Sequence, residues 1–150
     1  MTAGRRARGR RVFLPLALAW AGVIFVLSER ELRPGPTTVV WQLLHNGGHA
    51  AVFAALSALL LLGLPPGRAT AIAGVVLAST YGAIDELHQS FVPGRVPSVT
   101  DWITDTCGAV LGLTIVLLLR SVPEDRPRRV AAFLGTGLAC ILSALLATLA

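Results

Sequence analysis

The sequence predicts an all-α protein: a polytopic bundle of transmembrane helices with four core spans and a fifth, C-terminal span. Of its 150 residues, 54% are hydrophobic and only 14% are charged, whereas soluble domains carry about 25% charged residues. The apolar residues form five stretches, at residues 12–28, 47–64, 69–84, 102–119 and 130–150. Helices around a soluble core have polar faces at helical spacing, and these stretches have almost none. We therefore expect a membrane protein rather than a water-soluble monomer.

Each stretch is interpreted as one spanning helix. A helix rises about 1.5 Å per residue and needs roughly 17 to 25 residues to cross the hydrocarbon core, so several stretches are short. Snorkelling side chains or local thinning of the bilayer accommodate short spans. The connecting segments have the proline and glycine typical of turns, as in RPGPTT, PPGR, VPGRVPS and VPEDRPRR. We expect a single integral membrane domain over residues 1–150, with no repeat and no second domain.

The net charge of +5 comes from thirteen basic residues, all of them arginine. A basic patch can indicate nucleic-acid binding, but ten of these arginines lie in three short segments beside apolar stretches: Arg5, Arg6, Arg8, Arg10, Arg11, Arg68, Arg120, Arg126, Arg128 and Arg129. We therefore expect a lipid bilayer and no nucleic acid as partner. Because short cytoplasmic loops carry the excess of arginine, this pattern predicts a cytoplasmic N-terminus and an outer C-terminus. The other loops hold only Arg30, Arg33 and Arg95.

The first apolar stretch also has features of a cleaved signal peptide. It follows a basic segment, and Ala19, Trp20 and Ala21 form a small-x-small pattern. The apolar residues continue to Leu27, however, which is longer than the usual apolar region of about 7 to 15 residues. We expect a retained helix.

Polar residues gather at the outer ends of the predicted helices, and this clustering is the main functional signal. An ionised aspartate inside a membrane helix costs about 2.5 to 3.5 kcal/mol, so such groups usually face a polar cavity or a partner. The residues are Ser28, His49, Asp85, Glu86, Asp101 and Asp105. With the predicted orientation, the segment DELHQSFVPGR lies on the outer face.

If the third helix continues past Ile84, Asp85, His88 and Gln89 lie on one face, with Glu86 beside them. Adjacent carboxylates in a partly dry site suit general acid–base chemistry. The alternative is that these side chains simply lie in headgroups and water at a helix end, where charges cost little.

The sequence predicts different roles for Asp101 and Asp105. Ser98 and Asp101 fit a capping box at a helix start, which gives Asp101 a structural role. Asp105 lies one turn deeper on the same face, and Gly108 and Gly112 continue that face as a GxxxG spacing that allows another helix to approach closely. We expect this face to pack against a helix that carries His49 or Asp85, but the sequence leaves open whether Asp105 belongs to the site.

His45 and His49 have the spacing of zinc ligands on a helix, with Asp85, Glu86, His88 or Asp101 as further ligands. Gly47 and Gly48, which lie between the two histidines, weaken the helix that would align His45 with His49, and we expect no metal.

Arg95 follows a Pro-Gly turn. Its guanidinium either binds an anionic ligand through two parallel hydrogen bonds or pairs with Asp85, Asp101 or Asp105. Cys107 and Cys140 lie in apolar stretches and are interpreted as structural.

These residues together resemble the VanZ-like family of bacterial membrane proteins. The similar positions, over residues 12–119, are Ser28, Asn46, His49, Asp85, Glu86, Gln89, Pro93, Gly94, Arg95 and Asp101. Asp105 departs from the family pattern, which often has asparagine there. The resemblance implies a small helical bundle in the bacterial cell membrane and an association with low-level resistance to the glycopeptide teicoplanin. It implies no defined reaction.

The first hypothesis is an enzyme or binding protein of the cell envelope that acts on a lipid-linked or anionic head group. In it, His49, Asp85 and Glu86 are catalytic, and Gln89, Arg95 and Asp101 bind the substrate. The alternative is a structural lock of the same polar residues in a protein that acts through partners. Transport is least favoured, because the short spans contain no internal charge pathway. The sequence leaves open whether the protein is an enzyme, its cofactor and its oligomeric state.

Overall fold

The fold is that of a computed structural model, which describes residues 11–29 and 38–149 except for the side chains of Trp41, Gln42, His45 and Leu149. Within these residues the chain is helical and has no strand, which confirms the predicted all-α fold. The elements are α2 (Phe13–Ser28), α3 (Val39–Gly63), α4 (Arg68–Gln89), α5 (Val99–Leu119), a short 3-10 helix η1 (Pro123–Asp125) and α6 (Arg126–Leu149). The N-terminal Arg5, Arg6, Arg8 and Arg10, together with Arg30 and Arg33, lie outside the described residues.

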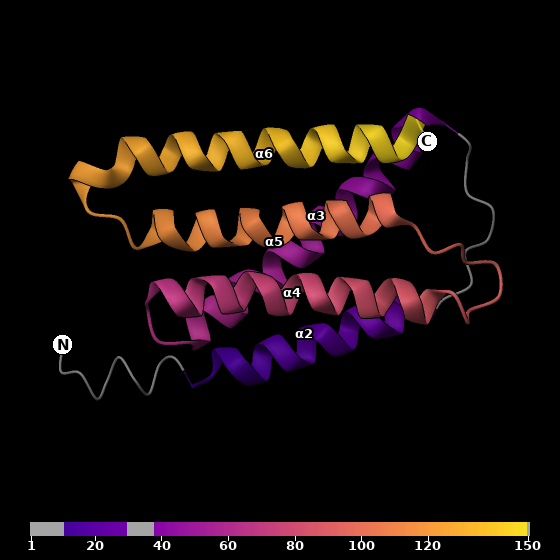
Figure 1. Ribbon diagram of the computed structural model, residues 1–150, viewed down its shortest axis with the longest axis horizontal. Helices are drawn as coiled ribbons and strands as arrows, with labels where there is room; N and C mark the ends of the chain where they lie inside the picture. Colours follow the sequence, from indigo (N-terminus) through magenta and orange to yellow (C-terminus); the bar gives the residue numbers. More distant parts are fainter. Residues whose placement is uncertain (1–10, 30–37, 150) are drawn as a thin grey trace.

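The helices form an antiparallel bundle (Figure 1). Helices α4, α5 and α6 lie side by side with alternating direction, and α3 crosses them diagonally. Helix α5 contacts α3, α4 and α6, and its contact with α3 is the most extensive in the bundle. Helix α2 packs against α3 and α4. The C-terminal ends of α2 and α4 therefore meet the N-terminal ends of α3 and α5 at one end of the bundle.

Helix α3 begins at Val39, eight residues before the predicted start at Gly47. The predicted start was that of the apolar stretch at residues 47–64, and the low helix propensity of Gly47 and Gly48 costs roughly 1 kcal/mol per glycine. Tertiary contacts offset this cost. Asn46, one residue earlier, is buried and donates from Nδ2 to Thr148 Oγ1 of α6 at 3.0 Å. The α3–α6 contact thus extends the helix through both glycines.

Close packing of α3 on α5 depends on the predicted glycine pair. A Cβ added to Gly108 would fall on the carbonyl oxygen of Ala50, and one added to Gly112 would fall on that of Ala54. The two backbones therefore touch where a side chain would keep them apart, as small residues permit in membrane bundles. The expected packing of the Gly108 face against the helix of His49 is confirmed.

Three segments are long and apolar enough to cross a membrane: Asn46–Gly63, Val99–Leu119 and Pro123–Thr148. Helix α2 is apolar but has only 16 residues. Helix α4 has 22 residues and lower hydropathy, because it carries Asp85, Glu86 and Gln89, and these side chains are buried in the bundle. Large apolar side chains such as Leu18, Leu77 and Leu134 are exposed on the outside. This arrangement is typical of a multi-pass membrane protein, with apolar groups toward lipid and polar groups inside.

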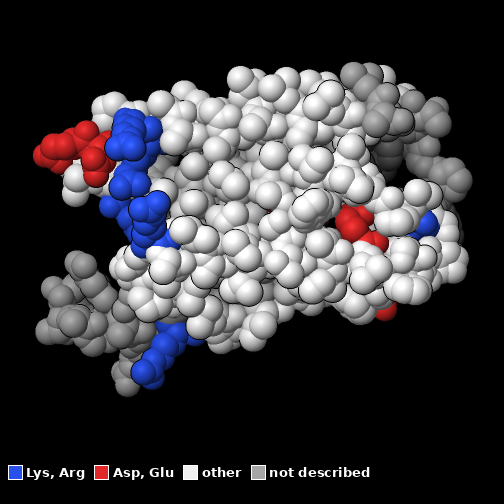
Figure 2. All heavy atoms as spheres, viewed as in Figure 1, with Lys and Arg blue, Asp and Glu red and all other residues white. Residues whose placement is uncertain are grey.

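Charged side chains occupy the two ends of the face shown in Figure 2, and the middle of that face is uncharged. One end holds the α3–α4 and α5–α6 connections (Figure 1), and with them Arg68, Arg120, Arg126, Arg128 and Arg129 as well as Glu124 and Asp125 of η1. Arg120 is anchored by a 3.0 Å hydrogen bond from Nη2 to the carbonyl of Leu61. At the opposite end, Arg95 lies in the α4–α5 connection, which follows the last turns of α4 with Asp85 and Glu86. The bundle therefore has a basic end and an end that contains the predicted site.

Candidate functional site

Polar side chains from α2, α3, α4 and α5 meet inside the non-basic end of the bundle. Ser28 ends α2, Asp85, Glu86 and Gln89 lie in the last turns of α4, and Asp105 lies in the second turn of α5. All five are buried, and Asp105 has no exposed surface at all. Buried groups of this kind need hydrogen bonds or opposite charge, so their partners define what the site can do.

Asp85 joins α2 to α4. Its Oδ2 atom accepts a hydrogen bond from Ser28 Oγ at 2.8 Å and another from Gln89 Nε2 at 3.0 Å. Helix α4 continues to Gln89, as this contact requires. Two donors on one oxygen fix the orientation of the carboxylate, while Oδ1 is buried without a hydrogen-bond partner among the described residues.

Glu86 joins α4 to the start of α5. Its Oε2 atom accepts a 2.7 Å hydrogen bond from the backbone N–H of Ser98. Ser98 is also the N-cap of α5, because its Oγ accepts from the backbone N–H of Asp101 at 3.2 Å. The predicted N-cap at Ser98 is confirmed, but the second half of the capping box is not formed by Asp101, because the Ser98 N–H donates to Glu86 instead. The second Glu86 oxygen, Oε1, is buried and has no hydrogen-bond partner in the described part of the chain.

His49 and Asp105 form a pair between α3 and α5. Nδ1 of His49 lies 3.1 Å from Oδ1 of Asp105. Gly82 of α4 provides the space for this carboxylate, because a Cβ added there would lie 3.1 Å from Asp105 Oδ2 and 3.3 Å from the Phe53 ring. Gly82 and Glu86 are four residues apart and share a face of α4. Asp105 thus lies between the helices of His49 and Glu86.

Arg95 does not pair with Asp85, Asp101 or Asp105. Within the described residues it makes no ion pair within 4.0 Å of a carboxylate, and its Nη2 atom donates to the carbonyl of Leu27 at 3.1 Å. The reason is the turn before it, in which Gly94 has a φ of 79° and turns the chain back toward the end of α2. The predicted Arg95–carboxylate partnership is therefore wrong. Asp101 is partly exposed at the start of α5.

His88 faces away from this group of residues. Its ring lies 4.5 Å from the Phe25 ring of α2, centre to centre, and its Nε2 is 4.0 Å from Glu29 Oε1. Asp85, His88 and Gln89 were predicted to share one face of α4. Of the three, Asp85 and Gln89 are in contact, whereas His88 packs against Phe25. The His45 side chain lies outside the described residues.

A cleft of about 330 Å³ opens beside Glu86. It lies between the last turns of α4 and the first turn of α5. Its lining includes Ala83, Glu86, Leu87, Ser90, Ser98 and Trp102. The walls are mainly apolar, so the Glu86 carboxylate is the acidic group that a molecule in this cleft would meet.

A family model described as VanZ/LLP1 matches residues 13–120. The chain belongs to the VanZ/LLP1 family. The match confirms the resemblance drawn from the sequence over residues 12–119, and it includes every predicted site residue. No curated protein matches the chain, and no solved structure does.

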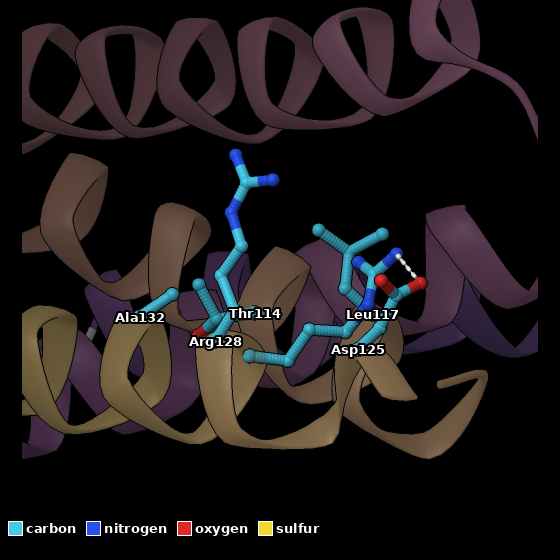
Figure 3. Close-up of a pocket in the computed structure, with 6 residues that line it drawn as sticks. Thr114, Leu117, Asp125, Arg128 and Ala132 are labelled. Atoms are coloured by element: carbon cyan, nitrogen blue, oxygen red, sulfur yellow. Dashed lines mark ion pairs between the residues drawn. The ribbon is translucent and has the colours of Figure 1, made fainter. Parts of the chain in front are cut away.

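Helix α6 lies beyond the VanZ/LLP1 match. It packs on α5 and α3, and at the basic end it contributes to a second pocket, of about 300 Å³. Figure 3 shows Thr114, Leu117, Asp125, Arg128 and Ala132 around it. Arg129 also lines this pocket and pairs with Asp125 at 3.7 Å. Arginines at this level suit the headgroup region of a bilayer.

Sequence reasoning left Asp105 undecided and did not consider Ser98 or Gly82 as parts of the site. The signal for Asp105 was its position on the GxxxG face, since the close approach at Gly108 brings Asp105 to His49. No comparable signal marks Gly82, because its role depends on the angle between α4 and α5.

Proposed function

We propose that this VanZ/LLP1 protein is an integral membrane protein of the bacterial cell envelope whose polar site faces outward and acts on a lipid-linked or anionic envelope molecule. In this proposal His49, Asp85 and Glu86 are the catalytic group, and Gln89, Arg95 and Asp101 contribute to substrate binding. By family association, the cellular effect is reduced susceptibility to a glycopeptide such as teicoplanin.

The Glu86 carboxylate is the observation that carries the proposal. Glu86 is only 6% exposed, it holds the start of α5 through Ser98, and it is one of the residues that line the cleft. Its Oε1 atom is buried and has no hydrogen-bond partner among the described residues. A carboxylate with one fixed and one free oxygen can exchange a proton with a ligand while its position stays constant. We therefore assign proton transfer to Glu86.

The other acids support Glu86 in different ways. Asp105 orients the His49 imidazole, as a carboxylate does in many acid–base pairs. Within the catalytic group, Ser28 and Gln89 fix Oδ2 of Asp85, and Oδ1, which has no hydrogen-bond partner among the described residues, is the oxygen assigned to the reaction. Arg95 uses one nitrogen for the Leu27 carbonyl, and its guanidinium has further donors that suit an anion such as a phosphate.

The apolar walls of the cleft suit the lipid part of a lipid-linked molecule. Leu87 and Trp102, which line it, are both exposed on the surface of the bundle. A head group at the bilayer surface could then reach Glu86 while its chain remains in the hydrocarbon region. An outward orientation agrees with the arginine pattern, because the basic end is expected in the cytoplasm.

The test is teicoplanin susceptibility of a sensitive host that expresses the wild-type protein, Glu86→Gln or Glu124→Gln. Glu124 is exposed at the basic end. Glu124→Gln is therefore the control for Glu86→Gln, because it makes the same substitution outside the site. We expect the protective effect to be lost in Glu86→Gln and kept in Glu124→Gln at equal amounts of protein in the membrane. Equal protection by all three proteins would remove Glu86 from the mechanism.

A structural lock is the second candidate, and the Ser28–Asp85–Gln89 hydrogen bonds favour it. They join α2 to α4, and none of these three residues lines the cleft. If the polar residues only lock the bundle for binding to partners, protection will follow the stability of each variant. If Glu86 is catalytic, Glu86→Gln will lose protection while its unfolding midpoint in detergent stays close to that of the wild type.

A further inference from the structure

Three potential metal ligands converge from three different helices. His49 of α3, Glu86 of α4 and Asp105 of α5 each offer one ligand atom, and these atoms lie within 4.8 Å of one another. The ligand set considered from the sequence was a different one, built on the His45–His49 pair, and no metal was expected there. The fold instead selects Asp105, the residue that departs from the family pattern.

The charges of this group are incompletely compensated. Glu86 and Asp105 are more than nine-tenths buried, and each has one oxygen that is buried and without a hydrogen-bond partner among the described residues. In the same part of the chain, no arginine lies within 4.0 Å of either carboxylate. Two carboxylates this close in a dry interior repel each other, so the site requires protons or a cation.

We propose that His49, Glu86 and Asp105 bind a divalent transition-metal ion, zinc in the first instance. The cation supplies the positive charge that the two carboxylates lack, and it occupies their free oxygens. In the metal-bound form Glu86 Oε1 is a ligand, so the proton exchange assigned to Glu86 above applies to the form without the ion. An imidazole with two carboxylates is a donor set for zinc, whereas magnesium and calcium prefer oxygen ligands alone. This inference stands on the ligand geometry and does not depend on which envelope molecule the protein acts on.

Three protein ligands leave at least one coordination position open, as in catalytic rather than structural zinc sites. Water or an oxygen of a bound ligand would fill that position. Because Glu86 also lines the cleft, an ion bound to the Glu86 carboxylate would lie close to a molecule bound in the cleft. An ion at this place could polarise a phosphoryl or carbonyl oxygen.

The test is zinc binding by the full chain, purified in mild detergent with an affinity tag that contains no histidine. After removal of metal with a chelator and dialysis, zinc is titrated by calorimetry and bound metal is counted by mass spectrometry. We expect one zinc per chain. In Asp105→Asn, which has the residue common in the family, and in His49→Ala, we expect affinity to fall by more than about 100-fold, since even changes to residues that support metal ligands cost 10- to 100-fold.

Two control variants test whether zinc binds at His49, Glu86 and Asp105 or at another place in the protein. His88→Ala removes a histidine at the same end of the bundle, Asp125→Asn removes a carboxylate at the basic end, and neither residue is in the ligand set. Both should keep one zinc with unchanged affinity. No zinc in the wild-type protein, or zinc that survives Asp105→Asn and His49→Ala together, would overturn the proposal.

A further variant guards against loss of binding through unfolding. His49→Cys exchanges a nitrogen ligand for sulfur, and with cobalt in place of zinc it should show a sulfur-to-cobalt charge-transfer band in the near ultraviolet. The wild-type protein with cobalt should lack this band. Absence of the band in folded His49→Cys with bound cobalt would show that His49 is not a ligand.

Discussion

The Nδ1 atom of His49 on α3 lies 3.1 Å from the Oδ1 atom of Asp105 on α5. This contact joins two helices whose backbones already touch at Gly108 and Gly112. Asp105 is fully buried and the His49 side chain is 15% exposed. Little water is therefore available to replace either partner, so each residue should depend strongly on the other.

We expect a coupling free energy of about 1–3 kcal/mol between His49 and Asp105, because residues in direct buried contact show interaction energies of that order. The measurement is a double-mutant cycle of His49→Ala and Asp105→Ala. Unfolding is followed in mild detergent with added denaturing detergent and a chelator, so that no metal contributes.

The control cycle combines His88→Ala with Asp105→Ala. His88 lies against Phe25 on the α2 side of the bundle, so the two changes should be additive within about 0.5 kcal/mol. Equal coupling in both cycles would mean that the effect belongs to the bundle as a whole and not to the His49–Asp105 contact.

The α3–α5 contact should tolerate no side chain at Gly108. In Gly108→Ala the new methyl group meets the Ala50 carbonyl oxygen and backbone, which cannot move aside as a flexible side chain can. We expect the free energy of unfolding to fall by about 1–3 kcal/mol, the usual cost of overpacking. The same detergent unfolding assay measures it.

Gly135→Ala is the matched control for Gly108→Ala. Gly135 lies in α6, and no atom lies within 4 Å of the position of an added Cβ. Alanine has the higher helix propensity by up to about 1 kcal/mol, so this variant should be neutral or more stable. Two equally destabilised variants would contradict the close approach at Gly108.

The network around Asp85 predicts a stability cost at Ser28. Ser28→Ala removes one of the two donors to Asp85 Oδ2, and hydrogen bonds to charged groups contribute about 1.5–3 kcal/mol. We expect a loss of that order in the free energy of unfolding. In Ser90→Ala, which removes an exposed hydroxyl that donates to the nearby Leu87 carbonyl, the loss should be under about 0.5 kcal/mol. Similar losses in the two variants would argue against a buried network.

The helices could be predicted from the sequence because their signals are local. Apolar stretches separated by Pro-Gly turns gave five helices, and Ser98 with Asp101 marked the start of α5. The glycine pair also predicted the α5 packing face. The start of α3 could not be predicted, because contacts such as that of Asn46 with Thr148, far away in the chain, override the low propensity of Gly47 and Gly48.

The site was less predictable because its contacts depend on helix rotation and crossing angle. Spacing alone placed Asp85, His88 and Gln89 together, yet in the bundle His88 packs against Phe25 and Gln89 bonds to Asp85. For the same reason, the direction of Arg95 depended on the conformation of Gly94, and no sequence pattern reveals that it reaches the Leu27 carbonyl. Close contacts between helices need three-dimensional information.

The orientation of the bundle in the membrane follows from the proposal that the basic end is cytoplasmic. In a variant without Cys107 and Cys140, we expect Phe91→Cys to react with a membrane-impermeant maleimide added to intact cells, because Phe91 is 78% exposed beside the site. Glu124→Cys, at the basic end, should react only after the membrane is permeabilised. The arginine asymmetry is the physical reason, since translocation of short basic loops is disfavoured. If Glu124→Cys reacted in intact cells and Phe91→Cys did not, the site would face the cytoplasm, and a substrate on the outer face would be ruled out.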